Sequence, residues 1–167
     1  TFSCKTTYGV ALGKLDQGTC MNCLDDTKRQ ALFPEYRAVV NTAKDQIFCD
    51  NSQGNIGFYD GHGFISQQRD VVKCQNQVMR GLMKAAKCLN LHCHQKTAEG
   101  LFWNKPRVDN AACEDGDLVK SCKAHFEVST KDLTGCPPCL VNNISAVWTS
   151  FQQALDTNNG DIYCTDQ

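Results

Sequence analysis

The stretch Val71–Leu89, VVKCQNQVMRGLMKAAKCL, carries the clearest periodicity in the chain. Its apolar residues recur at helical spacing on one side, and a second set widens that side: Val71, Val78, Leu82, Ala85 and Leu89, with Met79, Met83 and Ala86 beside them. We therefore predict a helix over this stretch. Because so broad an apolar face needs cover on more than one side, we expect the helix to lie centrally, between segments from the two ends of the chain.

The two ends of the chain resemble two copies of one four-cysteine unit. The first copy begins CKTTYGV at Cys4 and the second begins CKAHFEV at Cys122. Each continues to a Cys-x-x-Cys pair followed by leucine, and each closes on an aromatic residue and a cysteine, at Cys49 and Cys164. The gaps between consecutive cysteines are 15, 2 and 25 residues in the first copy and 13, 2 and 24 in the second. We interpret this match as an internal duplication.

The duplication predicts three segments in the chain. These are a four-cysteine unit over residues 1–50, a central segment over 51–121 and a second copy of the unit over 122–167. The central segment holds four further cysteines, separated by 13, 4 and 19 residues, and a glycine-rich stretch. It is either a diverged third unit or an unrelated insertion, and the sequence leaves both alternatives open.

Twelve cysteines in 167 residues constrain the compartment of the protein. In a secreted chain such a set predicts disulfides, each contributing about 2–4 kcal/mol of stability. A zinc site is the alternative, but no histidine follows either Cys-x-x-Cys pair at ligand spacing. We therefore expect disulfides, with three possible pairings within each unit, at Cys4, Cys20, Cys23, Cys49, Cys74, Cys88, Cys93, Cys113, Cys122, Cys136, Cys139 and Cys164.

Charge and hydropathy narrow the range of partners. The net charge is −1, from 17 basic and 18 acidic residues interspersed along the chain, so neither nucleic acid nor a membrane surface is expected as a partner. No apolar run is long enough to span a bilayer. The start at Thr1, shortly before Cys4, is what a mature secreted protein would show, and the sequon at Asn143 predicts a glycan acceptor.

Local patterns predict the order strand, Cys-x-x-Cys, helix, strand in each unit. Alternating apolar residues indicate strands at Thr6–Leu12 and Ala124–Val128. A helix capped by Asp25 or Asp26 is expected to begin at or after Pro34, or to kink there. A second helix, capped by Asn142 or Asn143, carries Val147, Phe151 and Leu155 on one face, and residues 96–116 are expected to form a loop. The predicted fold class is thus a small, disulfide-rich α+β protein.

Two cysteine motifs suggest redox or haem chemistry and are better explained as parts of the disulfide frame. Cys136-Pro-Pro-Cys139 before a helix is similar to a thioredoxin-type site, but each unit is about half the size of that fold. The run from Cys88 to Cys93-His94 has four residues between its cysteines where a haem attachment site has two. We therefore predict no cofactor and no resident metal.

The sequence gives only weak evidence for catalytic residues. His62 lies between two glycines in a predicted loop, where it could act as a general base with Asp60 as its orienting partner and Glu35 as a second carboxylate. Nothing in the sequence fixes that geometry, so the chain is more readily explained as a non-enzyme. His92, His94 and His125 are expected to be surface or capping residues.

Aromatic residues offer the better binding candidates. The glycine-rich loop carries Tyr59 and Phe64, and Phe102-Trp103 stands beside polar residues where an exposed contact surface is expected. The leading hypothesis is a secreted, disulfide-stabilised structural protein that self-associates head to tail into filaments or arrays. A secreted module that binds a protein or a glycan is the alternative, and a small hydrolase using His62 is the third.

Overall fold

The computed structural model of the protein describes residues 25–49, 68–106, 108–116 and 120–163. Within these ranges every regular element is helical and no strand occurs, so the predicted α+β class is wrong. The predicted strand at Thr6–Leu12 lies outside the described ranges. The elements are α2 (Asp26–Ile47), α3 (Arg69–Cys88), the π-helix η2 (Leu89–His94), α4 (Gln95–Phe102), α5 (Asn110–Asp115), α6 (Cys122–Ser129), α7 (Pro138–Val141) and α8 (Ile144–Ile162).

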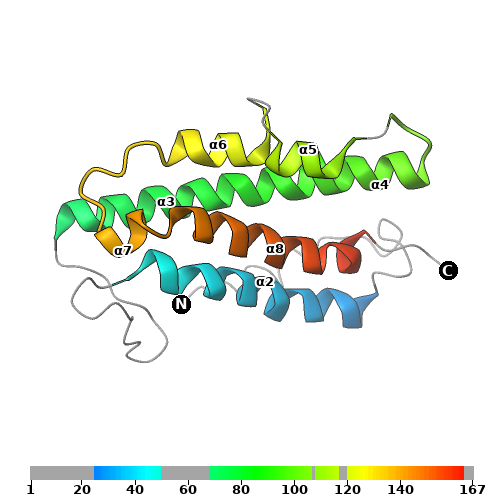
Figure 1. The fold of residues 1–167 in the computed structure, drawn as a ribbon. Coiled ribbons are helices and arrows are strands. Elements are labelled where there is room, and N and C mark those ends of the chain that lie inside the picture. Colours follow the sequence, from blue (N-terminus) through cyan, green and yellow to red (C-terminus); the bar gives the residue numbers. More distant parts are fainter. Residues whose placement is uncertain (1–24, 50–67, 107, 117–119, 164–167) are drawn as a thin grey trace.

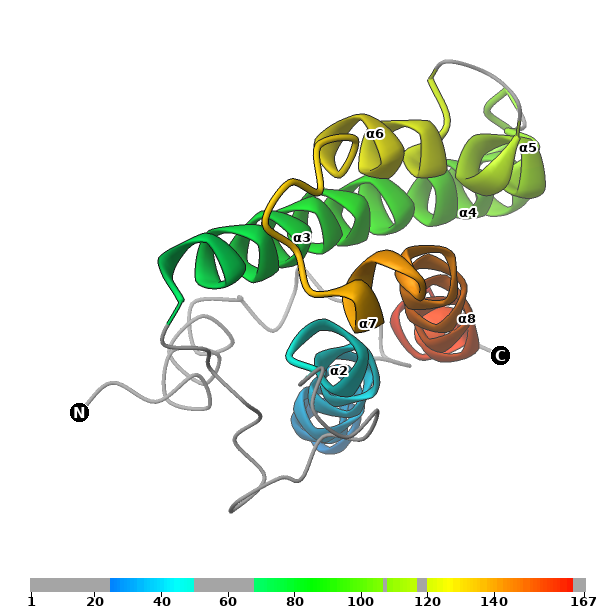
Figure 2. The ribbon, with the colours of Figure 1, turned by 60° about the vertical axis from the view of Figure 1, so that its left-hand side comes forward.

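The described helices pack in tiers on either side of one long helical run. Helix α3 passes through η2 into α4 without leaving helical backbone geometry, and Figure 1 shows the run crossing the whole molecule. Helices α5 and α6 lie on one side of it, and α8 lies on the other with α2 beyond, as Figure 2 confirms from a second direction. Helices α2 and α8 pack antiparallel, and these are the two helices that the sequence places after the Cys-x-x-Cys pairs.

The helix predicted over Val71–Leu89 is confirmed as α3 with the first residue of η2. It is central among the described helices, but the helices on its two sides, α6 and α8, both come from the second unit and not from the two ends of the chain. Val78, Leu82, Ala85 and Leu89 are buried in the core, whereas Met83 is exposed and does not widen the buried face. The core continues across the tiers through apolar residues of α2, α6, α7 and α8, among them Val39, Phe126, Leu140, Val147, Trp148, Phe151 and Leu155. Trp148 is thus a core residue.

The predicted strand at Ala124–Val128 is instead helix α6. Its two apolar residues alternate as in a strand, but about 200° separates them on a helix, and only Phe126 is buried while Val128 is exposed. The Ser121 hydroxyl accepts a hydrogen bond from the Ala124 N–H (3.1 Å) and begins the helix. Phe126 packs on Trp148 with ring centroids 5.4 Å apart, so tertiary packing and a cap decide this segment.

Three further expectations about helices need correction. Helix α2 begins at Asp26, ahead of Pro34, since the Asp25 carboxylate caps it by accepting from the Lys28 N–H at 2.8 Å. The segment 96–116, expected to be a loop, contains α4 and α5. The strand expected at the end of each unit is absent from the described residues, because helix α2 continues to Ile47 and helix α8 continues to Ile162.

Four disulfides join segments that are far apart in the sequence. The pairs are Cys49–Cys139, Cys74–Cys136, Cys88–Cys122 and Cys93–Cys113. The expectation of pairing within each unit is wrong for these cysteines, since three of the four bonds join different predicted segments. The adjacent cysteines of the CPPC motif bind two different partners, so this motif is structural. Cys4, Cys20, Cys23 and Cys164 lie outside the described residues.

Candidate functional site

Three ionisable side chains from three helices meet at one point, which we call the His94 cluster. It consists of His94 at the end of η2, Glu114 on α5 and Asp156 on α8. His94 Nε2 lies 2.9 Å from Glu114 Oε1 and 2.9 Å from Asp156 Oδ1. The side chains of His94 and Glu114 are 0% and 3% exposed, while that of Asp156 is 39% exposed. The cluster is therefore buried on two sides and open to solvent on the side of Asp156.

A disulfide and an unusual helix hold the cluster in place. Cys93 and Cys113 are bonded, and each immediately precedes a member of the cluster. The short helix α5 is thereby fixed to the long run at the point where His94 and Glu114 face each other. The π-helical segment η2 carries both Cys93 and His94, and π-helical turns within longer helices are frequent at functional sites.

Amide side chains orient Glu114 on both of its oxygens. Asn110 Nδ2 donates to Oε1, and Gln152 Nε2 donates to Oε2 at 2.8 Å. Asn110 lies one turn before Glu114 on α5, and Gln152 lies one turn before Asp156 on α8. Because these amides fix the carboxylate, the cluster has the second layer of hydrogen bonds that orients a binding or catalytic group.

The electrostatics of the cluster favour a charged imidazole beside Glu114. Burial lowers the pKa of His94, but the hydrogen bonds and negative charges of Glu114 and Asp156 outweigh it, so this pKa is raised. Burial opposes ionisation of Glu114, yet the bonds from His94, Gln152 and Asn110 prevail and lower its pKa. Burial and the Glu114 charge raise the pKa of Asp156 despite His94. The negative charge of Asp156 is therefore less well stabilised in the folded protein than that of Glu114.

One imidazole N–H cannot point along two directions at once, although Nε2 faces two carboxylate oxygens at equal distance. His94 Nδ1 is buried and has no hydrogen-bond partner among the described residues. The cluster thus holds two carboxylates around one donor. Such an arrangement can share a proton or hold a cation.

The second candidate site is an exposed surface at the end of α4, the Trp103 surface, made of Leu101, Trp103 and Lys105. Trp103 is 62% exposed and Leu101 is 57% exposed. The Lys105 ammonium lies 5.1 Å from the centre of the Trp103 ring and 3.4 Å from the Glu99 carboxylate. The predicted contact surface is confirmed as exposed at Trp103, while the side chain of Phe102 is outside what the structure describes.

The other predicted site residues are not brought together by the described structure. His62, Asp60, Tyr59 and Phe64 lie outside the described residues, so the hydrolase hypothesis and the aromatic loop stay predictions. Glu35 is half-buried on α2. The sequon residue Asn143 is exposed at the start of α8, and its side-chain amide donates to the Cys139 carbonyl at 2.8 Å.

Sequence reasoning missed the His94 cluster. His92 and His125 are exposed as predicted, but His94 is buried and its side chain makes no cap hydrogen bond to α4, so its interpretation as a surface or capping residue is wrong. Two signals were present in the sequence: Glu114 and His94 each follow a cysteine, and Asp156 follows the apolar helix position Leu155. They become informative only once Cys93 is known to bond Cys113.

Two grooves are further features of the described surface. One, of about 360 Å³ between α6 and α8, is lined by Phe126, Trp148 and polar residues. The other, of about 400 Å³ beside α3, is lined by the basic residues Lys73, Arg80 and Lys84. Neither includes a residue of the His94 cluster or of the Trp103 surface, so these are four separate features.

Among the described residues, no helix has the length and apolar character needed to cross a membrane. Comparison of the chain with models of protein families, with curated proteins and with solved structures finds no match.

Proposed function

We propose that this protein is an extracellular, disulfide-stabilised binding module that engages a protein partner through the Trp103 surface. The observation that carries the proposal is the exposure of Trp103, at 62% of its surface, beside the equally exposed Leu101. Tryptophan supplies more binding energy per residue than most side chains, and it is enriched among the residues that dominate protein interfaces. A large aromatic ring in water is a plausible anchor for a partner's pocket.

The backbone around Trp103 is ordered before any partner arrives. The Trp103 N–H donates to the Glu99 carbonyl at 2.9 Å and closes α4. Asn104 follows with a φ of 52°, a left-handed conformation that turns the chain sharply. Lys105 then returns to the Glu99 carboxylate, which Lys96 also contacts at 2.8 Å. Because this turn is fixed, less conformational entropy is lost on binding.

The charges beside the ring indicate the character of the partner. Two ammonium groups, of Lys96 and Lys105, share the single carboxylate of Glu99, which leaves a net positive charge next to the exposed ring. The complementary protein surface presents an apolar pocket with an acidic rim. The disulfides of the frame fit an extracellular location, where such a partner would be met.

The filament hypothesis is less favoured by the arrangement of the units. Head-to-tail assembly requires the surface of one unit to remain free for the other unit of the next molecule. Here α2 and α8, the long helices of the two units, pack on each other within one chain. Light scattering of the native protein tests this alternative: we expect a monomer, and regular polymers would favour assembly instead.

A screen against arrays of extracellular protein domains and of glycans tests the proposal. Wild-type protein, Trp103→Ala and Met83→Ala are compared, since Met83 is an equally exposed apolar residue on α3, outside the Trp103 surface. We expect protein hits that Trp103→Ala weakens at least tenfold and Met83→Ala leaves unchanged. Hits confined to glycans, or hits that survive Trp103→Ala, would contradict the proposal.

A further inference from the structure

We propose that the His94 cluster binds one divalent transition-metal ion of the zinc class, through His94 Nε2, Glu114 Oε1 and Asp156 Oδ1. This inference is independent of the Trp103 surface. The three atoms converge within 4.8 Å of one another from η2, α5 and α8. An imidazole nitrogen with two carboxylate oxygens is a donor set that zinc and its neighbours accept, whereas calcium and magnesium prefer oxygen alone.

A cation resolves the conflict that the hydrogen bonds leave. Both carboxylate oxygens lie 2.9 Å from the same nitrogen, so one N–H leaves at least one contact poorly directed. An ion placed between the three atoms interacts favourably with all of them at once. Its two positive charges also match the two carboxylates, and the imidazole binds as a neutral ligand.

The size of the site requires only a small adjustment. Ligand atoms about 2.1 Å from a tetrahedral zinc ion are about 3.4 Å apart, so the 2.9 Å contacts must widen by roughly half an ångström. Asp156 can supply that movement for its own contact because its side chain is partly exposed, at 39%. The contact between His94 and Glu114 must widen by side-chain rotation within the buried pair. The same exposed side gives an ion its path of entry and leaves a coordination position for water.

The surroundings of Glu114 resemble the outer layer of a metal site, whereas His94 Nδ1 has no partner among the described residues. Gln152 and Asn110 hold the two oxygens of Glu114, and such partners position ligating carboxylates in metal sites. The Cys93–Cys113 bond fixes the backbone next to two of the three ligands. The alternative sulfur cluster of Cys88, Cys93 and Cys122 does not qualify, because each of these cysteines is oxidised in a disulfide and offers no thiolate.

Titration of the full, oxidised chain with Co²⁺ and Zn²⁺ after treatment with a chelator tests the inference. Visible absorption reports the coordination of Co²⁺, and calorimetry reports stoichiometry. Asp156→Asn removes the exposed ligand, and Asp115→Asn is the matched control. Asp115 is next to Glu114 and 44% exposed, but its carboxylate contacts Lys123 at 2.8 Å. His94→Gln is the second test, and its folding is verified by circular dichroism.

We expect one ion per chain, a loss of affinity of more than about tenfold in Asp156→Asn, and unchanged binding in Asp115→Asn. Nitrogen NMR is expected to show the shift at Nε2 of His94, with His92 and His125 unaffected. Absence of binding by the wild type would overturn the inference. So would equal binding by Asp156→Asn and Asp115→Asn, or shifts confined to His92 or His125.

Discussion

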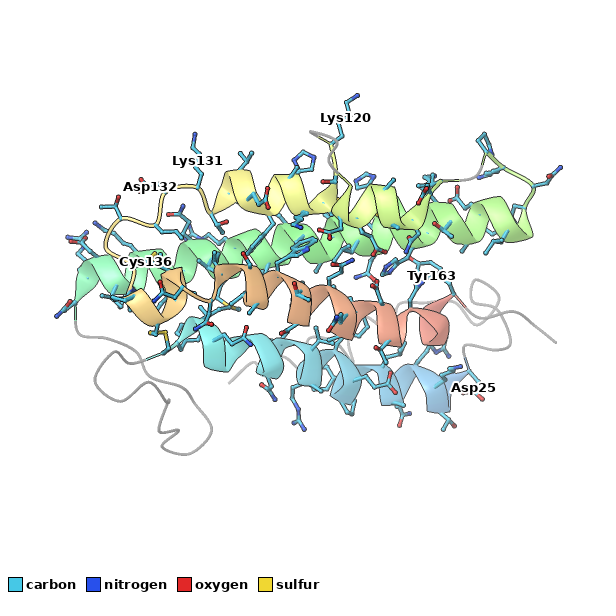
Figure 3. The ribbon with its side chains drawn as sticks, viewed as in Figure 1. Asp25, Lys120, Lys131, Asp132, Cys136 and Tyr163 are labelled. Atoms are coloured by element: carbon cyan, nitrogen blue, oxygen red, sulfur yellow. A yellow bond between two sulfur atoms is a disulfide. The ribbon has the colours of Figure 1, made fainter. Side chains whose placement is uncertain are left out.

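Two regions of the molecule are held together in contrasting ways. In the first, which we call the α7 region, Cys136 and Cys139 attach the chain around α7 to α3 and to the end of α2, and Leu140, next to Cys139, is fully buried. In the second, the His94 cluster, one disulfide is accompanied by three ionisable groups. Figure 3 shows Cys136, which belongs to the α7 region, near one end of the described bundle.

The contrast separates stabilisation from function. A buried apolar contact that disulfides hold in place is stable without a ligand. One buried and one partly exposed carboxylate around a single buried imidazole stabilise a fold only weakly, because desolvation of the charges offsets much of their attraction. We therefore assign the α7 region to stability and the His94 cluster to binding.

The largest effect on stability is expected from a substitution that disrupts the packing of the α7 region. Leu140→Ala removes a fully buried side chain next to Cys139, whose disulfide holds the backbone there, so the surroundings collapse little. We expect a loss of about 2–5 kcal/mol in the free energy of unfolding, measured by urea denaturation. Val141→Ala is the matched control because Val141 is exposed, and it should change stability by less than about 0.5 kcal/mol. Equal effects would refute the assignment of this region.

The next effect concerns the bond beside the cluster. Replacing both Cys93 and Cys113 by Ala opens a loop of 20 residues, which in the chain-entropy model lowers stability by about 3 kcal/mol. It should also weaken Zn²⁺ binding, since the bond positions His94 against Glu114. Denaturation and calorimetry on the same double variant measure both quantities. Undiminished Zn²⁺ affinity would show that the bond does not position the ligands.

A third effect is the pH dependence of the metal-free protein. The raised pKa of His94 contributes stability that is present below its unfolded pKa and is lost as pH rises through its folded pKa. The lowered pKa of Glu114 contributes stability that is lost as pH falls through its folded pKa. The raised pKa of Asp156 works against Glu114, because acidification relieves its charge. We expect maximal stability between about pH 4.5 and 6.5.

Thermal denaturation across pH in the presence of a chelator measures this profile. His94→Gln should lose the alkaline decline, whereas His125→Gln, which alters an exposed histidine, should keep it. An alkaline decline of the same size in both variants would assign the effect to other groups.

The smallest effect distinguishes the two regions most sharply. Asp156→Asn replaces a carboxylate whose raised pKa marks its charge as disfavoured in the folded state. Without metal, we expect its stability to stay within about 0.5 kcal/mol of the wild type, because the position is partly exposed. With Zn²⁺ added, the wild type should gain thermal stability and the variant should not. A large metal-free loss would make Asp156 a structural residue.

Part of the fold could be predicted from the sequence. The helical period of Val71–Leu89 and the cap at Asp25 are both set by residues that are close in the sequence, and both are confirmed. The strand predicted at Ala124–Val128 was wrong because the alternation consisted of only two apolar residues, which on the helix lie on opposite sides, one buried and one exposed. The Ser121 cap was the local signal for helix, and the packing of Phe126 against Trp148 settled it.

The candidate site could be predicted only in part, for a physical reason. A short stretch rich in aromatic and polar residues predicts the Trp103 surface, and Trp103 is exposed as expected, while its role in binding stays a prediction. The His94 cluster instead joins residues 94, 114 and 156, which only the tertiary fold brings together. Cysteine spacing predicted disulfides but not the bond between Cys93 and Cys113, and that bond places His94 beside Glu114.

The most direct test of the central claim is an anomalous difference map at the zinc absorption edge, from crystals of the full chain grown with Zn²⁺. The account predicts one strong peak between His94 Nε2, Glu114 Oε1 and Asp156 Oδ1, with the three atoms moved apart to ligand distance. A cluster without a peak, with His94 still bonded to both carboxylates, would contradict it.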